Sequence, residues 1–360
     1  MDELNNTDCH NQPTINTGAH MWISAVMFGL GFFGNVAALL ILEIQRRRDS
    51  RNKDMKPSGL FHIFILSLVV TDLTGTCLTS PVVLLSHAMN TTLVEMIPKC
   101  EVLCKYFGFS MTFFSLITLS LLLSTALDRC FAIGYPYLYC QHVTKKWAYV
   151  TIAVMFFISI MLSLLPFVGF GRYVQYCPGT WCFIDMNPPD KEDRAYANLF
   201  ATVMLVLVLT NVVCHGFVVY HLYKMYQRRN RRGSVIATMR SSSKRRMMSM
   251  AVEVEHLILL IVMTVIFLIC TLPLVFRVYI NSTTTHENHP MDLVALRFIS
   301  FTSIIDPWVF IFLSPGVLNF FWVSFCNAPL GRFSSSACKT SQAKDDHRSH
   351  LQTTYTEDKV

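Results

Sequence analysis

The sequence has 360 residues, of which 52% are hydrophobic and only 15% are charged. This composition is too apolar for a soluble protein of that length and indicates a membrane protein. The net charge of +7 suggests a nucleic-acid partner at first sight, but the basic residues are concentrated in two blocks, 46–56 and 228–246. Because these blocks lie between apolar runs, the positive-inside rule accounts for them without any nucleic acid.

Seven apolar runs divide the chain, and each is long enough to cross a bilayer as a helix, which takes about 20 residues. The runs are 21–42, 60–89, 104–133, 147–170, 196–226, 256–280 and 291–314. They predict an all-α membrane protein, a seven-transmembrane helix bundle. The expected organisation is a short segment 1–20, a helical domain 21–325 with a basic loop at about 227–252, and a polar tail 326–360.

Glycosylation sequons begin at Asn5, Asn90 and Asn281, in segments on the same side of the predicted bundle as the amino end. The basic blocks fall on the opposite side, as cytoplasmic loops do. A single sequon arises easily by chance, so the argument depends on the agreement of all three with the charge bias. We expect a plasma-membrane protein with its amino end outside the cell and its carboxyl end in the cytoplasm.

The seventh run contains two charged residues, Arg297 and Asp306. A charge inside the bilayer costs about 2.5–3.5 kcal/mol even on the insertion scale, so such residues tend to be functional and paired. Asp306 is followed by Pro307, which removes a backbone donor from the helix. Arg297 either binds an anion inside the bundle or extends to the outer headgroups, since it lies near the start of the run.

Two further polar residues, Asn35 and Asp72, fall in the middle of the first and second runs. Because lone buried carboxyl groups are costly, Asp72, Asn35 and Asp306 are expected to form one polar cluster. The two acids would either hold a cation such as sodium or form a protonated, hydrogen-bonded pair. They would also be the carboxylate pair of an intramembrane protease. The two halves show no repeat of the kind that transporters carry, and a ligand-gated switch makes better use of the remaining charges.

The triplet Asp128-Arg129-Cys130, at the inner end of the third run, resembles the Asp/Glu-Arg-Tyr motif of rhodopsin-like G-protein-coupled receptors. Signatures of the first, second and seventh helices of that family are matched by Gly34-Asn35, by 68–72 and by 306–310. These four motifs occur in the right order, and the resemblance covers roughly residues 20–325. The resemblance implies a receptor with a G protein as its partner, and no enzymatic activity or cofactor.

Two departures from the family pattern, at Cys270-Thr271-Leu272-Pro273 and at Asp306-Pro307-Trp308, match the prostanoid receptors. The loop 171–183 resembles the signature loop of that subfamily almost residue for residue. Among the prostanoid receptors, the stretches 111–116, 296–298 and 303–309 are most similar to prostaglandin E receptors of the Gs-coupled, relaxant branch. The resemblance implies a prostaglandin E receptor that raises cyclic AMP. A prostaglandin D or prostacyclin receptor is the alternative, with a membrane carrier of anionic amphiphiles as the alternative from another class.

The charge pattern of the helices agrees with an acidic ligand. The outer half of the third run has no acid to pair with an amine, and the seventh run has no Lys for a retinal Schiff base. Arg297 can hold a carboxylate through two parallel hydrogen bonds. The resemblance places eight further residues around the ligand: Thr180, Trp181, Ser24, Met27, His87, Met111, Phe114 and Leu296. His87 stands where the family usually has Tyr. Thr180 and Trp181 have packing of the loop as their alternative role.

The resemblance also implies a disulfide between Cys104 and Cys182, which an extracellular setting permits. A second disulfide would join Cys177 to Cys9, with Cys100 as the rival partner, and the sequence does not choose between them.

On the cytoplasmic side, Arg129 is expected to pair with Asp128 and with Glu253, and Pro273 to act as a hinge of the sixth helix. Ser234 follows basic residues and is either a kinase site or a solvated loop serine. Residues 317–325 predict a short amphipathic eighth helix on the membrane, followed by Cys326 as a palmitoylation candidate. The polar tail is expected to bind arrestin after phosphorylation by receptor kinases.

Overall fold

The computed structural model describes residues 21–51, 59–96, 102–177, 179–232, 240–283 and 289–313. Seven of its helices are long and apolar enough to cross a membrane, which confirms the predicted seven-helix bundle. They are α1 (Met21–Arg51), α2 (Gly59–Met89), α4 (Val102–Gly134), α6 (Lys145–Leu164), α7 (Lys191–Arg232), α8 (Arg240–Thr283) and α9 (His289–Leu313). The predicted eighth helix lies outside the described residues.

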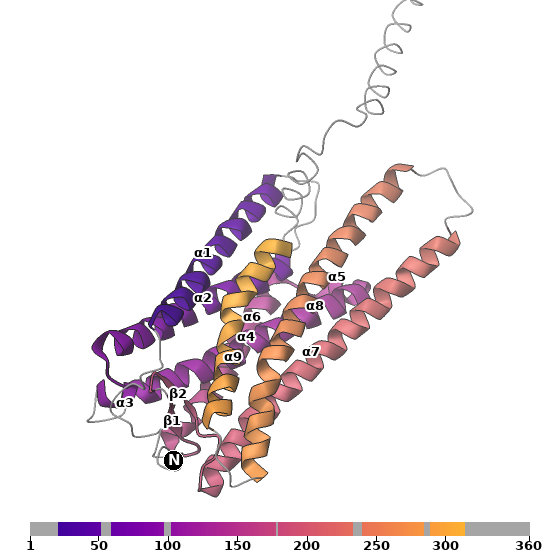
Figure 1. Cartoon of the computed structure of the whole chain (residues 1–360). Coiled ribbons are helices and arrows are strands. Elements are labelled where there is room, and N and C mark those ends of the chain that lie inside the picture. Colours follow the sequence, from indigo (N-terminus) through magenta and orange to yellow (C-terminus); the bar gives the residue numbers. More distant parts are fainter. Residues whose placement is uncertain are drawn as a thin grey trace, which may run out of the picture. The chain divides into compact units, whose positions relative to one another are not determined.

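Six of these helices close a ring in which each packs against the next, in the order α1, α2, α4, α7, α8, α9 and back to α1 (Figure 1). The remaining one, α6, packs outside the ring against α4 and α2. The most apolar part of α4 is 78% buried, whereas that of α6 is only 11% buried. The helix α4 is therefore the centre of the bundle, and α6 presents an apolar surface of the kind that faces lipid.

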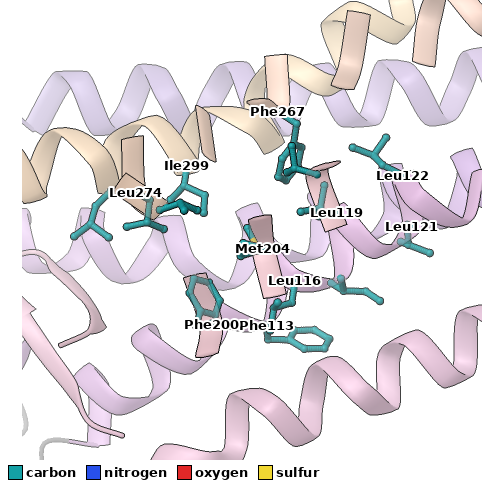
Figure 2. Close-up of a cluster of buried hydrophobic side chains, with 14 of the residues drawn as sticks. Phe113, Leu116, Leu119, Leu121, Leu122, Phe200, Met204, Phe267, Leu274 and Ile299 are labelled. Carbon is teal, nitrogen blue, oxygen red and sulfur yellow. The ribbon is translucent and has the colours of Figure 1, made fainter. Parts of the chain in front are cut away.

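Large apolar side chains fill the space between the helices of the ring (Figure 2). Those labelled in the figure come from α4, α7, α8 and α9: Phe113, Leu116, Leu119, Leu121, Leu122, Phe200, Met204, Phe267, Leu274 and Ile299. Lipid tails are as apolar as these side chains, so removal from water contributes little to helix association inside a bilayer. The close fit of the side chains must therefore stabilise the bundle.

Between α6 and α7 lies an antiparallel hairpin of β1 (Tyr173–Tyr176) and β2 (Trp181–Ile184), which the sequence did not predict. A short 3₁₀ helix, Leu165–Val168, leads into it from α6. The connecting turn contains Gly179 at φ +99°, in the left-handed region that glycine adopts without strain. We call the end of the bundle that carries these strands the hairpin end.

The hairpin is fastened to α4 and α6 by close contacts. A Cβ atom added at Gly108 of α4 would lie 2.6 Å from the ring of Tyr173, so only glycine lets β1 approach this closely. The hydroxyl of Tyr173 donates to the carbonyl of Ser163 at 2.9 Å, and that of Tyr196 donates to Leu162 at 3.1 Å. The first bond holds β1 to the end of α6, and the second, from a side chain of α7, reaches a carbonyl that also accepts the backbone N–H of Leu165. Burial raises the pKa of Tyr173 to about 12, so this hydroxyl keeps its proton at neutral pH.

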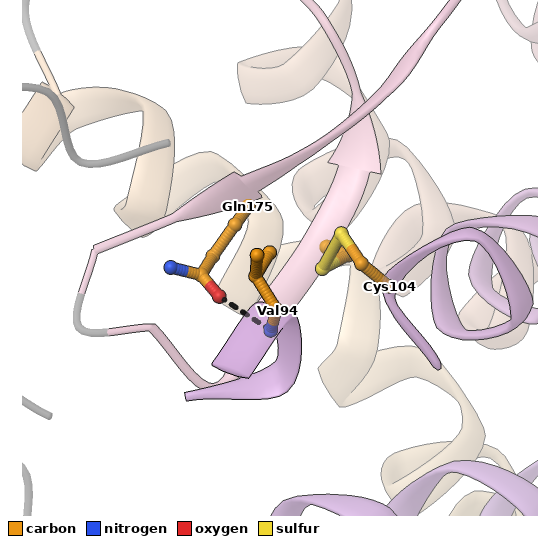
Figure 3. The surroundings of a disulfide bond; sticks show 4 residues. Val94, Cys104 and Gln175 are labelled. Carbon is orange, nitrogen blue, oxygen red and sulfur yellow. Dashed lines mark hydrogen bonds between the residues drawn. A yellow bond between two sulfur atoms is a disulfide. The ribbon is translucent and has the colours of Figure 1, made fainter. Parts of the chain in front are cut away.

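A disulfide joins Cys104 of α4 to Cys182 of β2, and this predicted pair is confirmed (Figure 3). Beside it, the backbone N–H of Val94, in the short helix α3 (Leu93–Met96), donates to Gln175 Oε1 at 3.1 Å. Cys177 is also disulfide-bonded, and its partner lies outside the described part of the chain. The choice between Cys9 and Cys100 therefore stays open.

Candidate functional site

A cavity of about 830 Å³, open solvent included, lies between the helices at the hairpin end. Its lining comes from α1, α2, α4, β2 and α9. Five of the residues predicted to surround a ligand are part of it: Ser24, Met27, Met111, Phe114 and Trp181. The indole of Trp181 meets the ring of Phe107 edge to face, with centroids 6.0 Å apart. The hairpin thus contributes the side chain of Trp181 to the cavity lining.

Arg297 is exposed and, within the described residues, makes no hydrogen bond or ion pair. On α9 it precedes Ser300 by three residues and Ile304 by seven, and both of these line the cavity. Residues at this spacing share one face of a helix, so Arg297 lies on the cavity side, about 5 Å nearer the hairpin end than Ser300. An unpaired guanidinium in this position can hold a carboxylate through two parallel hydrogen bonds.

The other residues predicted around the ligand do not line the cavity. Leu296 is completely buried in the packed core of the bundle. It precedes Arg297 by one residue on α9 and therefore faces a different side of the helix. Thr180 is only 1% exposed and precedes Trp181 in the hairpin. His87 is half-buried in the last turn of α2. The predicted roles of these three side chains remain predictions.

A set of hydroxyl groups on the cavity wall was missed from the sequence: Thr76, Thr79, Ser80, Ser115, Thr118, Ser300, Thr302 and Ser303. Several of them donate to a carbonyl one turn back on their own helix, as Thr76 does to Asp72 and Thr79 to Gly75, both at 2.8 Å. Their protons are thereby engaged, so these oxygens can serve a ligand only as acceptors. The spacing of Thr76, Thr79 and Ser80, three and four residues apart in an apolar run, was the available signal.

The predicted polar cluster lies at the deep end of the cavity, where Asp72 is part of the wall. Asp72 accepts a hydrogen bond from Thr118 at 3.0 Å, and Asn35 donates to the carbonyl of Ser303 at 3.2 Å. Among the described residues, the second oxygen of Asp72, both carboxyl oxygens of Asp306 and the amide oxygen of Asn35 have no partner. Such oxygens fit a monovalent cation or a proton shared between the acids. No group of three or more His, Cys, Asp or Glu side chains suited to a metal occurs in the described part.

At the opposite end of α4, Arg129 and Asp128 form a buried ion pair in which Arg129 Nε donates to Asp128 at 3.1 Å. Tyr139, in α5 (Pro136–His142), donates to the same carboxylate at 2.7 Å. The guanidinium also lies over the ring of Phe61, 5.3 Å from its centroid. Pro273 lies inside α8 and Pro307 inside α9. The side chain of Glu253 lies outside the described part, so its predicted contact with Arg129 stays a prediction.

The glycosylation site predicted at Asn281 does not fit the structure. This side chain is in α8, is 2% exposed, and donates to both carboxyl oxygens of Asp292 at 3.2 and 3.3 Å. A glycan on that nitrogen would need space that is already filled, because the packing of α8 against α9 buries it. Asn90, by contrast, is exposed in a turn with φ +52°. Asn5, Ser234 and Cys326 lie outside the described residues.

Comparison with known proteins identifies the family. Residues 9–310 match the model of the 7 transmembrane receptor (rhodopsin family). The chain is 41% and 42% identical to the prostaglandin E2 receptor EP2 subtype of Canis lupus familiaris and Homo sapiens, over 87% of both chains in each comparison. It is 34% identical to the prostaglandin D2 receptor of Mus musculus, over 89% of this chain and 93% of that one.

The fold is that of squid rhodopsin, with a TM-score of 0.70 at 16% identity over 90% of this chain and 84% of rhodopsin. Receptors of this family bind a ligand and have a G protein as their partner, and they are not enzymes. The chain is thus a multi-pass membrane protein that belongs to the rhodopsin family of seven-transmembrane receptors and, within it, to the prostanoid receptors.

Proposed function

We propose that this chain is a plasma-membrane receptor for prostaglandin E that activates Gs and so raises cyclic AMP. The observation that carries the proposal is that Arg297 is exposed, has no partner among the described residues and shares a face of α9 with Ser300 and Ile304, which line a mostly apolar cavity. Identity of 41–42% to prostaglandin E2 receptors, against 34% to prostaglandin D2 receptors, supports the choice of the E type.

A prostaglandin matches the chemistry of the cavity. It has one carboxylate, long hydrocarbon arms and a few oxygen substituents, and this cavity, like most sites for such molecules, is mainly apolar with a few polar groups in its wall. Arg297 would hold the carboxylate, with Thr180, Ser24 and His87 as further polar contacts near the head. The hydrocarbon arms would pack on Met27, Met111, Phe114 and Trp181, while hydroxyl groups of the ligand donate to the acceptors on the wall.

Signalling follows if the ligand binds one arrangement of the helices better than the other, because differential affinity is what shifts a population. The Asp128–Arg129 pair, with Glu253 as a further partner, would hold the closed arrangement, and Pro273 would let α8 bend as it opens. A sodium ion at Asp72 would favour one arrangement through the carboxyl and amide oxygens there that have no partner among the described residues. The amino end would lie outside the cell, and receptor kinases and arrestin would act on the cytoplasmic tail.

The test is cyclic AMP production in cells that express the chain, titrated separately with prostaglandins E2, D2 and I2. The variants Arg297→Ala and Arg297→Lys are tested beside the wild-type chain, with all three matched for surface expression. Prostaglandin E2 should be the most potent ligand, and Arg297→Ala should lose the response, while Arg297→Lys keeps part of it because the charge remains.

Greater potency of prostaglandin D2, which the 34% identity to its receptors makes the second candidate, would overturn the E assignment and keep the subfamily. Uptake of the ligand without nucleotide exchange on a G protein would instead identify a carrier.

A further inference from the structure

A second arginine at the hairpin end, Arg277 of α8, is engaged with an acid of α9. Its Nε donates to Asp292 at 2.7 Å, and the two side chains are only 16% and 6% exposed. Asn281 of α8 adds its amide, which reaches both oxygens of the same carboxylate at 3.2 and 3.3 Å. The carboxylate of Asp292 is thus held from α8 by one full positive charge and a second donor.

Asp292 is also the acid closest to Arg297 along α9, five residues away. Side chains five residues apart do not share a face of a helix, so Asp292 points toward α8 while Arg297 lies on the cavity side. Both are nevertheless on the same two turns, about 8 Å apart along the axis. A bare carboxylate at Asp292 would therefore lower the positive potential at Arg297.

We propose that Arg277 is a positioning residue for ligand specificity: by neutralising Asp292 it leaves the full charge of Arg297 to the carboxylate of the ligand. Asn281 supports this by fixing the orientation of Asp292. The inference rests on the proposed function, because it assumes that Arg297 binds an acidic ligand. It goes further in assigning the pair on α8 and α9 an electrostatic role in the choice of acid over neutral ligands.

The size of the effect follows from Coulomb's law. One uncompensated charge about 10 Å from a bound unit charge, at an effective dielectric constant of about 20, changes affinity roughly tenfold. The ester of the same ligand has no charge, so its affinity should not respond. A packing role for Arg277 would affect acid and ester alike, which makes the ratio of the two affinities the decisive quantity.

The experiment measures binding of prostaglandin E2 and of its methyl ester to membranes that contain the full-length chain. The variants are Arg277→Met, Arg277→Lys, Asp292→Asn and the double variant Arg277→Met/Asp292→Asn. Arg172→Met is the matched control, because it removes an arginine from an ion pair with Asp185 outside α8 and α9. The acid-to-ester ratio should fall roughly tenfold in Arg277→Met, stay unchanged in Arg277→Lys and in the control, and return to the wild-type value in the double variant.

An equal loss of acid and ester affinity in Arg277→Met, or an unchanged ratio, would overturn the inference. If Arg277→Met does not reach the membrane, Asp292→Asn decides alone, since removal of the acid should raise the ratio, and an unchanged or lower ratio contradicts the proposal. A wild-type chain with no preference for the acid would refute the carboxylate anchor and this inference with it. If the wild-type chain prefers the acid and the acid-to-ester ratio is unchanged in Arg277→Met, the inference about Arg277 is refuted while the carboxylate anchor stands.

Discussion

The helix α4 and the strand β1 approach each other closely at Gly108, and adding one methyl group there should destabilise the receptor. The Cβ atom of Gly108→Ala would lie 2.6 Å from the ring of Tyr173, so the ring and its strand must shift. Overpacking of this kind costs about 1–3 kcal/mol. The opposing gain from replacing glycine with alanine inside a helix is about 0.5–1 kcal/mol, so the net loss is about 0–2.5 kcal/mol, centred near 1 kcal/mol.

A matched control is available in α1. A Cβ atom added at Gly29 meets nothing within 4 Å, so Gly29→Ala should show the helical gain alone. In thermal unfolding of the detergent-solubilised protein, Gly108→Ala should lower Tm by a few degrees, since about 1 kcal/mol corresponds to roughly 2–4 °C for a domain of this order. Gly29→Ala should leave Tm unchanged or raise it.

The same substitution should also weaken ligand binding, because the displaced hairpin carries Trp181 on the cavity wall. A Gly108→Ala protein with the Tm of the Gly29→Ala control and with wild-type affinity would show that the contact between α4 and β1 is not tight, and the reasoning would fail.

Three further outcomes are expected. Replacing Asn90 with Gln should remove a glycan and increase mobility on a gel, whereas Asn281→Gln should leave mobility unchanged, and a shift with Asn281→Gln would contradict the buried position of that side chain. Tyr173→Phe deprives the carbonyl of Ser163 of its donor and should cost about 1–3 kcal/mol, measured as a lower Tm, while an unchanged Tm would mean that another group replaces the bond. Glu253→Gln should raise cyclic AMP without ligand at equal surface expression, and unchanged basal activity would count against the predicted contact with Arg129.

The helices of the bundle could be predicted from the sequence because the thickness of a bilayer sets the length of a span and requires it to be apolar. The cysteine pair of α4 and β2 could be predicted from family resemblance. The hairpin itself could not. Each of its strands has four residues, and β1 is buried along its whole length, so neither strand shows the alternation of apolar and polar residues that marks a half-buried strand.

Within the site, the sequence predicted which kinds of side chain line the cavity. It failed where the outcome depends on which side of a helix faces a neighbouring helix. Leu296 and Arg297 are neighbours in the sequence, but on α9 they lie about 100° apart, so one enters the core while the other is on the cavity side. The sequon at Asn281 was a correct local pattern, but the packing of α8 on α9 buries its side chain. Both outcomes depend on which helices are neighbours, which a local pattern does not contain.

The central claim is that Arg297 binds the carboxylate of the ligand, and competition binding tests it most directly. Prostaglandin E2 and its methyl ester should be compared on the wild-type chain, Arg297→Lys and Arg297→Gln, each at equal surface expression. The wild-type chain should prefer the acid by tenfold or more, as expected for a charged hydrogen-bonded pair worth about 1.5–3 kcal/mol, and Arg297→Gln should bind acid and ester equally. A preference for the acid that persists in Arg297→Gln would contradict the account.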